Sequence, residues 1–429
     1  MKLVRRRLGD IAQIVGGATP STKISEYWDG GIPWITPKDL SGFDSIYIEH
    51  GSRSISQDGL EHCSAKILPI GTVLYTSRAP IGYVAIATVP VTTNQGFKSL
   101  VLNVGYVPEY IYYLLKFSKS EIESYSSGGT FAEISANALA EVELDFPDEK
   151  HQRAIAKVLL NLDNKIQANQ NISETLEEIA QTIFKSWFID FDPVKAKMAG
   201  EKPVGMDDAT AALFPDSMEY SELGPIPHGW KLSQVGDEVV CVGGSTPSTA
   251  NSEFWDGDIF WTTPKDLSKQ IGLVTTSSER RITSKGLQKI SSGVLPVHSV
   301  LMSSRAPIGY LSINAVPTAV NQGFIAIRES PRFVPLYLLF WLQTNMSEIK
   351  NRAGGGTFAE ISRGAFKSIP FVLPNEQVLL KYAEISTPIL LQLTSLSLQN
   401  HELKNLRDSL LPRLISGELQ IPEEMLVMR

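Results

Sequence analysis

The residues best suited to chemistry in this chain occur twice. Arg donates two parallel hydrogen bonds that match phosphate oxygens and guanine edges, and Asn and Gln match adenine edges. Glycine-rich loops let a backbone approach closely and offer N–H donors to phosphate. Such residues form four repeated motifs: Thr36-Pro37-Lys38-Asp39 with Thr263-Pro264-Lys265-Asp266, Ser77-Arg78 with Ser304-Arg305, Asn94-Gln95-Gly96 with Asn321-Gln322-Gly323, and Gly128-Gly129-Thr130 with Gly355-Gly356-Thr357.

A structural role is an equal alternative for each motif. In that alternative, Ser-Arg-Ala-Pro-Ile-Gly is a turn, and Arg78 pairs with Asp39. Residues shared by both copies cannot distinguish two different sequences, so we expect them to position the DNA backbone, while residues that differ specify bases. The candidate DNA-binding residues are Lys38, Arg53, Arg78, Asn94, Gln95, Thr130, Lys265, Arg280, Arg281, Arg305, Asn321, Gln322 and Thr357.

Catalytic motifs are missing from the sequence. There is no Gly-x-x-x-x-Gly-Lys phosphate loop, no Gly-x-Gly-x-x-Gly between a strand and a helix, and no His-Glu-x-x-His pair. The six histidines are scattered, whereas metal ligands cluster. We therefore expect no catalytic, cofactor-binding or metal site on this chain.

The repeat has one constant spacing. Gly16, Leu68 and Gly128 each begin a block that returns 227 residues later, at Gly243, Leu295 and Gly355. A repeat this long indicates tandem domains, because solenoid units are only ~20–50 residues long.

Between the shared blocks the copies diverge. Ser41–Ile67 and Ser268–Val294 are the longest divergent patches, and neutral drift at exposed loops would give the same pattern. We predict that these patches select the base sequence. The second patch is the more basic, with Arg280, Arg281, Lys285 and Lys289 against Arg53 and Lys66.

Each copy has the local signals of an α/β (α+β) domain. Val73–Tyr75 and Val84–Ala87 are rich in β-branched residues, which predicts strands on either side of a turn at Ala79-Pro80. Val107–Phe117 has helical spacing with a proline near its start.

A long apolar seam follows each copy and predicts two antiparallel coiled-coil helices, each ~60 Å long if it has about 40 residues. Asn169 and Asn400 either fix the register of the seam or face solvent at its edge. The apolar positions are Ile155, Val158, Leu162, Ile166, Ile172, Leu176, Ile179 and Ile183, then Leu379, Tyr382, Ile385, Ile389, Leu393, Leu396, Leu403, Leu406 and Leu410. The candidate helix–helix or partner residues are Leu162, Ile166, Asn169, Leu176, Leu393, Leu396, Asn400 and Leu403.

These signals divide the chain into five parts. A proline- and glycine-rich stretch reads as a linker returning the chain to the second domain. The predicted parts are a first recognition domain (1–147), a central helix (148–189), the linker (190–227), a second recognition domain (228–374), and a C-terminal helix and tail (375–429).

Composition adds one objection to DNA binding. The net charge is −7, whereas nucleic-acid binders often carry a basic stripe. Local patches, or partners that contact phosphate, would answer it. Two cysteines without a Cys-x-x-Cys pair, no signal-peptide core and no apolar stretch of bilayer length predict a cytoplasmic protein without a membrane partner.

Several independent motifs resemble the specificity subunits of type I restriction-modification enzymes. The segments GGATPSTKISEYWDGGIPWITPKDL, TSRAPIGYVAIA, TNQGF and GGTFAEIS resemble the family's target-recognition domains, and LDNKIQANQNISETLEEIAQTIFKSWFIDFDPV and HELKNLRDSLLPRLISGEL resemble its conserved helices. The resemblance covers nearly the whole chain. The two recognition domains are unusually alike for this family, which leaves open how different their half-sites are.

The resemblance implies a non-catalytic subunit that reads a bipartite target in double-stranded DNA. Two modification subunits would bind its helices and transfer methyl groups from S-adenosylmethionine to adenine, and restriction (motor) subunits would complete the complex. S-adenosylmethionine, ATP and Mg would then be used by partners, with no cofactor on this chain. Two alternatives stay open: a duplicated enzyme domain of unknown chemistry, and a coiled-coil assembly adaptor.

Overall fold

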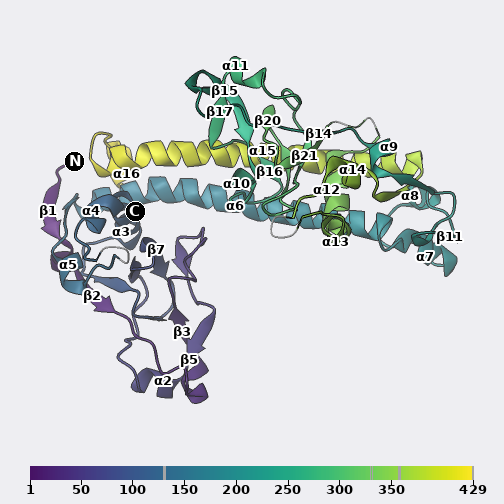
Figure 1. The fold of residues 1–429 in the computed structure, drawn as a ribbon. Coiled ribbons are helices and arrows are strands. Elements are labelled where there is room, and N and C mark those ends of the chain that lie inside the picture. The colour runs from purple at the N-terminus through teal and green to yellow at the C-terminus, as the bar shows by residue number, and fades with distance from the viewer. Residues whose placement is uncertain (129–131, 329, 331, 356–358, 428–429) are drawn as a thin grey trace. The chain divides into compact units, whose positions relative to one another are not determined.

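The chain forms two compact units, each built from one α/β domain and parts of two long helices (Figure 1). The computed structural model describes residues 1–128, 132–328, 330, 332–355 and 359–427. Unit 1 contains Met1–Gln167 and Leu403–Arg429, and unit 2 contains Ala168–Glu402.

The domain of unit 1 contains two mixed sheets and a separate antiparallel strand pair. The five-stranded sheet has the order β2 (Ala12–Gly16), β9 (Lys98–Leu102), β6 (Val73–Ser77), β7 (Ile81–Ala87) and β4 (Tyr47–Ile48). The three-stranded sheet has the order β5 (Arg53–Ile55), β3 (Trp28–Ile35) and β8 (Thr92–Thr93), and β1 (Val4–Arg7) pairs with β10 (Glu143–Phe146). The helices are α1 (Leu8–Ile11), η1 (Ser25–Tyr27), α2 (Gln57–Glu61), α3 (Pro108–Phe117), α4 (Lys119–Glu123) and α5 (Ala136–Ala140).

The domain of unit 2 repeats this topology. The five-stranded sheet has the order β14 (Cys241–Gly243), β21 (Phe324–Ile327), β18 (Val300–Ser303), β19 (Leu311–Asn314) and β16 (Val274–Thr275). The three-stranded sheet has the order β17 (Arg280–Ile282), β15 (Trp255–Thr262) and β20 (Thr318–Val320). The separate strand pair is β13 (Lys231–Gln234) with β22 (Pro370–Leu373). The helices are α9 (Val235–Glu238), η2 (Ser252–Phe254), α10 (Pro264–Leu267), α11 (Ser284–Leu287), α12 (Pro335–Thr344), α13 (Met346–Asn351) and α14 (Arg363–Lys367). The predicted duplication of one α/β fold is confirmed, as are the predicted strand pair and helix of the first copy.

We call each three-stranded sheet with its short helix the tip of its domain. The first tip is β3, β5, β8 and α2, and the second is β15, β17, β20 and α11. In each unit the tip lies on the side of the domain away from the long helices (Figure 1).

Shared glycines keep the frame of the two domains the same. A Cβ atom on Gly17 would lie 2.1 Å from the carbonyl oxygen of Asn94, and one on Gly244 would lie 1.8 Å from that of Val320. No side chain fits at these distances, which explains why the Gly-Gly pair begins the shared motif in both copies.

The two long helices are α6 (Glu149–Phe188) and α15 (Glu376–Ile415), so they begin and end at the same repeat spacing as the domains. In unit 2, Asn169 bonds to Gln399, whereas Phe184 lies against Tyr382. Residue numbers therefore rise on one helix as they fall on the other, and the helices are antiparallel, as predicted.

The buried seam of α6 differs from the predicted one at two positions. Ile172 and Ile179 are about 45% exposed, whereas the next residues along the chain, Ser173 and Ala180, are half-buried and buried. Leu406 of α15 is likewise exposed. The prediction followed hydrophobicity alone and therefore chose the bulkier residue at each position. In the structure, smaller residues occupy the seam, where the helices and the domain pack together.

The candidate helix residues otherwise lie in the packed interior. Ile166, Asn169, Leu393 and Leu396 are buried, and Leu162, Leu176, Asn400 and Leu403 are half-buried.

The segment expected to be a linker is ordered. It contains α7 (Asp192–Met198), α8 (Asp208–Ala212) and a hairpin of β11 (Met218–Ser221) and β12 (Gly224–Pro227). Val194 and Phe214 are buried in the core of unit 2. At the C-terminal end of the chain, Met425 of α16 (Glu423–Val427) packs against the core of unit 1.

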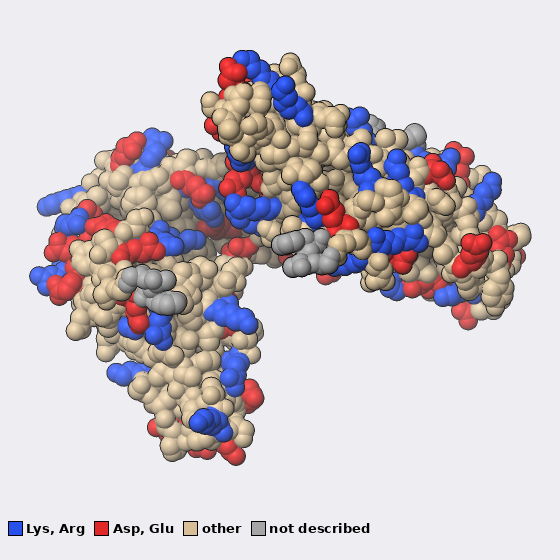
Figure 2. All heavy atoms as spheres, in the orientation of Figure 1, with Lys and Arg blue, Asp and Glu red and all other residues tan. Residues whose placement is uncertain are grey.

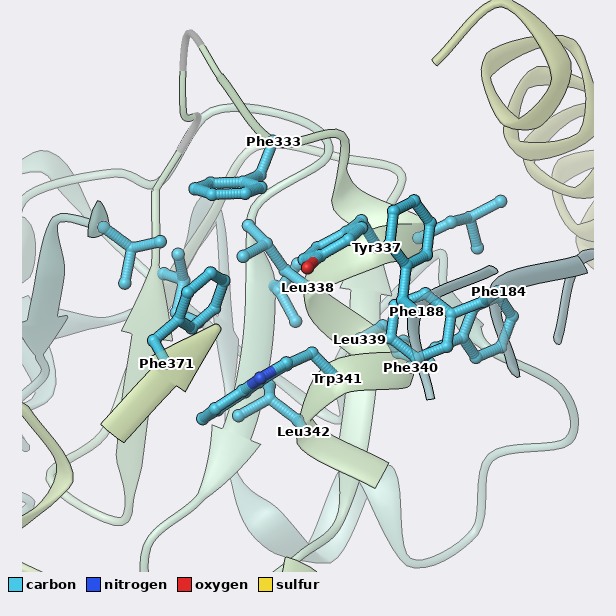
Figure 3. Close-up of a cluster of buried hydrophobic side chains, with 14 of the residues drawn as sticks. Phe184, Phe188, Phe333, Tyr337, Leu338, Leu339, Phe340, Trp341, Leu342 and Phe371 are labelled. Atoms are coloured by element: carbon cyan, nitrogen blue, oxygen red, sulfur yellow. The ribbon is translucent and has the colours of Figure 1, made fainter. Parts of the chain in front are cut away.

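The most apolar stretch of the sequence lies in the core of unit 2. Figure 3 shows Tyr337, Phe340 and Trp341 of α12 surrounded by other aromatic residues, including Phe184 and Phe188 of α6. In the part of the chain that the structure describes, no helix is both long and apolar enough to cross a membrane.

Candidate nucleic-acid interface

A groove in the second domain brings three of the four repeated motifs together with the residues that follow the fourth. Its volume is about 940 Å³. Apart from Lys350 of α13, the lining residues come from the motifs Thr-Pro-Lys, Arg-Ala-Pro-Ile, Asn-Gln-Gly and the segment after Gly-Gly-Thr: Thr263, Pro264, Lys265, Arg305, Ala306, Pro307, Ile308, Asn321, Gly323, Ala359 and Glu360. Motifs that are up to about a hundred residues apart in sequence thus form one surface.

The Thr-Pro-Lys-Asp motif is a capped turn that points its lysine outward. The Asp39 carboxylate accepts hydrogen bonds from the backbone and side chain of Thr36 and from the backbone of Ser52. Burial opposes ionisation of Asp39, but these hydrogen bonds outweigh it and lower its pKa. Asp266 caps Thr263 in the same way, so this aspartate is structural in both copies.

The two lysines of this motif have different surroundings. Lys38 is exposed. The Nζ atom of Lys265 lies 3.0 Å from an Oε atom of Glu279, and this contact holds the pKa of that carboxyl below its ordinary value.

Each of the two shared arginines pairs with a glutamate that is also present in both copies but was not among the candidate residues. The Arg78 guanidinium lies 3.3 Å from Glu133, and that of Arg305 lies 3.6 Å from Glu360. The alternative in which Arg78 pairs with Asp39 is therefore wrong, because Asp39 is occupied by its own turn. Both arginine side chains stay more than a third exposed, so each keeps donors toward solvent.

The Asn-Gln-Gly motif uses its side chains to hold the backbone. The Oδ1 atoms of Asn94 and Asn321 accept hydrogen bonds of 2.9 Å from the backbone of Gly96 and Gly323. An adenine edge needs both the donor and the acceptor of an amide. Each Oδ1 thus already accepts one backbone hydrogen bond, which fixes the orientation of the amide.

The two glutamines are engaged as well. Gln95 accepts a hydrogen bond from the hydroxyl of Thr19, and Gln322 accepts one from Thr246. Since both are exposed, their NH₂ groups face solvent.

Arg53 and Arg280 occupy equivalent positions within the divergent patches. The guanidinium carbon of Arg53 lies 3.5 Å from the ring centroid of Trp28, and that of Arg280 lies 3.4 Å from Trp255. Both residues are therefore part of the shared frame of the tips.

Three further Lys and Arg residues of the second divergent patch have no Lys or Arg at the equivalent positions of the first. Arg281, Lys285 and Lys289 occupy the positions of Ser54, Asp58 and His62. Figure 2 shows Lys and Arg side chains gathered over this part of unit 2.

Two candidate threonines, Thr130 and Thr357, lie outside the described residues, and Lys350, which was not a candidate, lines the groove. Lys350 of α13 lines the groove, but its counterpart in the first copy is Glu123, so no repeated signal marked it. The shared glutamates Glu133 and Glu360, by contrast, stand in the repeated GGTFAEIS motif and could have been found there.

Polar side chains link α6 to α15 in both units, with different residues in each. In unit 1 the hydroxyl of Tyr113 donates to Asp163, which also pairs with Arg407 at 2.6 Å. Burial and the Asp163 carboxylate both raise the pKa of Tyr113. In unit 2, Asn169 is fully buried and its Nδ2 donates to Gln399 at 2.6 Å and to Asn400 at 2.8 Å. The seam therefore buries Asn169, which removes the solvent-facing alternative for that residue.

No group of three or more potential ligands among the described residues could hold a metal ion.

Comparisons with known proteins agree with this architecture. The family model described as the type I restriction modification DNA specificity domain matches residues 2–178 and 227–396. The MjaIX specificity subunit of a type I restriction enzyme from Methanocaldococcus jannaschii is 35% identical, over 97% of this chain and 94% of that protein. The HindI specificity subunit from Haemophilus influenzae is 27% identical, over 73% of this chain and 78% of that protein.

A solved structure shows the same fold. It is the S subunit of a type I restriction-modification system from M. genitalium, which matches with a TM-score of 0.59 and 16% identity over 96% of both chains. The chain therefore belongs to the family of type I restriction-modification specificity subunits, which are non-catalytic, and it carries two of the family's DNA specificity domains.

Proposed function

We propose that the chain reads a bipartite target in double-stranded DNA, with one half-site for each domain, and docks two modification subunits on its long helices. Restriction (motor) subunits complete the complex. The partners use S-adenosylmethionine, ATP and Mg, and the complex works in the cytoplasm. One observation carries the proposal: three motifs present in both domains, and the residues that follow a fourth, converge on a single groove, with Lys265, Arg305 and Lys350 in its walls.

The division of labour follows from what the two copies share. The shared groove residues contact phosphates, because contacts to the backbone are the same for any sequence. The tips contact base edges, because they differ between the copies in the residues that point to solvent. Local cations at the groove and the second tip answer the objection raised by the net charge of −7.

Exposed apolar residues on the helices support docking of the modification subunits. In unit 2, Ile172 and Ile179 on α6 and Leu391 and Leu398 on α15 are 38–54% exposed. Each pair is seven residues apart, so its members lie on the same face of their helix. We assign these residues, which the chain itself leaves uncovered, to contact with the modification subunits.

Co-expression of the chain with its modification subunits in a methylation-free host, followed by methylome sequencing, tests this proposal. We expect adenine methylation at a target with two specific halves and a constant spacer. A host with the modification subunits alone is the control and should show none. Methylation by the chain alone would favour a duplicated enzyme. Assembly with the partners but no DNA retained by the complex in gel-shift experiments would favour an adaptor.

A further inference from the structure

The second tip holds an arginine that the first tip lacks. Arg281 of β17 stands directly across from Phe260 of β15. Its guanidinium carbon lies 4.4 Å from the centroid of the phenylalanine ring. In the first tip the same cross-strand pair is Ser54 and Pro33. Both partners of the contact are thus replaced together.

Its neighbour Arg280 has a different role. Arg280 lies over Trp255 just as Arg53 lies over Trp28, and both indole N–H groups donate to a backbone carbonyl, of Ser248 and Ser21. Successive residues on a strand point to opposite faces of the sheet. Arg280 therefore covers the shared tryptophan, whereas Arg281 lies on the other face.

The charge of Arg281 is available. It is exposed, and no acidic side chain in the described residues lies within ion-pair distance of it. Three nearby lysines are paired instead: Lys265 and Lys269 with Glu279, and Lys285 with Glu253. Contact with an aromatic face orients a guanidinium without using its hydrogen-bond donors.

We propose that Arg281 reads a guanine in the second half-site, and that Phe260 positions its guanidinium. The planar fork donates one hydrogen bond to guanine O6 and one to N7, the pair of acceptors that the major groove presents only at guanine. The first domain lacks both residues, so the two half-sites differ at this base pair. This inference rests on the proposed function, since it names a base contact of the same DNA-reading surface.

Methylome sequencing of the full complex tests the inference with Arg281→Ser, which installs the first copy's residue. We expect one guanine of the second half-site to become any base, with a loss of discrimination of roughly 5- to 150-fold, while the first half-site and the spacer stay unchanged. Phe260→Leu should relax the same position less. Lys202→Ser, which removes an exposed cation elsewhere in unit 2, is the matched control and should change no base.

The reciprocal variant Pro33→Phe/Ser54→Arg should add a guanine requirement to the first half-site. Thermal unfolding of each variant checks that the tips remain folded. An even decrease of methylation at all sites in Arg281→Ser would assign Arg281 to a phosphate and overturn the inference, and so would an unchanged target. A wild-type complex without bipartite methylation would instead refute the proposed function, and the inference would fall with it.

Discussion

The two units pack their helices against their domains with different side chains at the same positions. Tyr113, Asp163 and Arg407 of unit 1 form a hydrogen-bonded ion network. Positions 227 residues away in unit 2 hold Phe340, Leu390 and Ala180, which are all buried in the apolar core. The same backbone junction therefore exists in a polar and an apolar version within one chain.

This difference shows that the fold does not need the polar network. Replacing a buried ion pair by apolar residues often costs little, but removing one partner leaves an uncompensated charge. Asp163 and Arg407 have side chains that are only 16% and 23% exposed, so each depends on the other. At these positions the junction of unit 1 therefore depends on matched polar partners, whereas that of unit 2 depends on apolar packing.

The largest effect is expected from placing the polar residue in the apolar junction. Leu390→Asp buries a carboxylate with no cation beside it and should destabilise unit 2 by about 3–5 kcal/mol, measured by urea denaturation. Leu391→Asp is the matched control, because this neighbour is 54% exposed, and it should change stability by less than about 0.5 kcal/mol. Similar losses in both variants would mean that the junction of unit 2 is not selective for apolar residues.

A smaller effect is expected from breaking the network of unit 1. Asp163→Leu leaves Tyr113 without its acceptor and Arg407 without its buried partner, and should cost about 2–3 kcal/mol. The triple variant Tyr113→Phe/Asp163→Leu/Arg407→Ala copies unit 2 and should regain most of this loss. Denaturation of the single and triple variants measures both. A triple variant less stable than the single one would show that the two junctions are not interchangeable.

The groove of the second domain should attract DNA more strongly than the equivalent surface of the first domain. Lys350 lines the groove of the second domain, whereas the equivalent Glu123 in the first lies 3.7 Å from Lys119. Lys350→Glu should weaken DNA binding by the complex several-fold and make its salt dependence shallower, because at least one phosphate contact is lost. Glu123→Lys should strengthen binding. Salt titrations on a duplex carrying the target measure both, and equal slopes in wild type and variants would contradict a phosphate contact.

The smallest effect concerns Glu177 of α6, whose counterpart on α15 is Lys404. Burial raises the pKa of Glu177, although the backbone N–H of Leu273 partly offsets this by donating to it. Below about pH 4 the carboxyl is neutral in the folded and unfolded chain alike, but as the pH rises the unfolded chain ionises first and folding loses stability. Glu177→Gln should therefore raise Tm by on the order of 1–2 °C at pH 7 and leave it unchanged near pH 3. A gain that persists at pH 3 would exclude this cause.

Sequence patterns predicted the elements and the duplication well, because both depend on local spacing. The predicted central helix at 148–189 differs from α6 by one residue at each end, and the predicted start of the C-terminal helix at 375 lies one residue before that of α15. The seam was less predictable: Ile172 and Ile179 are the bulkier residues, but Ser173 and Ala180 lie nearer the contact. Hydrophobicity does not report how closely two helices approach.

The sequence predicted which residues form the candidate site better than it predicted which residues they pair with. The repeated motifs do converge on one groove, but the sequence could not show that Arg78 pairs with Glu133. Pairing across about 55 residues depends on the sheet order, which periodicity does not contain. Likewise, Arg53 and Arg280 stood in divergent patches, and only the structure shows both lying over a shared tryptophan.

The constant spacing of the repeat has a consequence for the gene. A crossover between the two coding repeats, within the shared motifs of the domains, would delete 227 codons and keep the reading frame. The shortened product would have one chimeric domain followed by α15 alone, with the helix in its original phase. It would retain Arg407 but have lost Asp163, so any pairing between two such products would place that arginine opposite Leu390. The intact chain, in which Arg407 faces Asp163, would therefore differ in its helix pairing from the product of such a deletion.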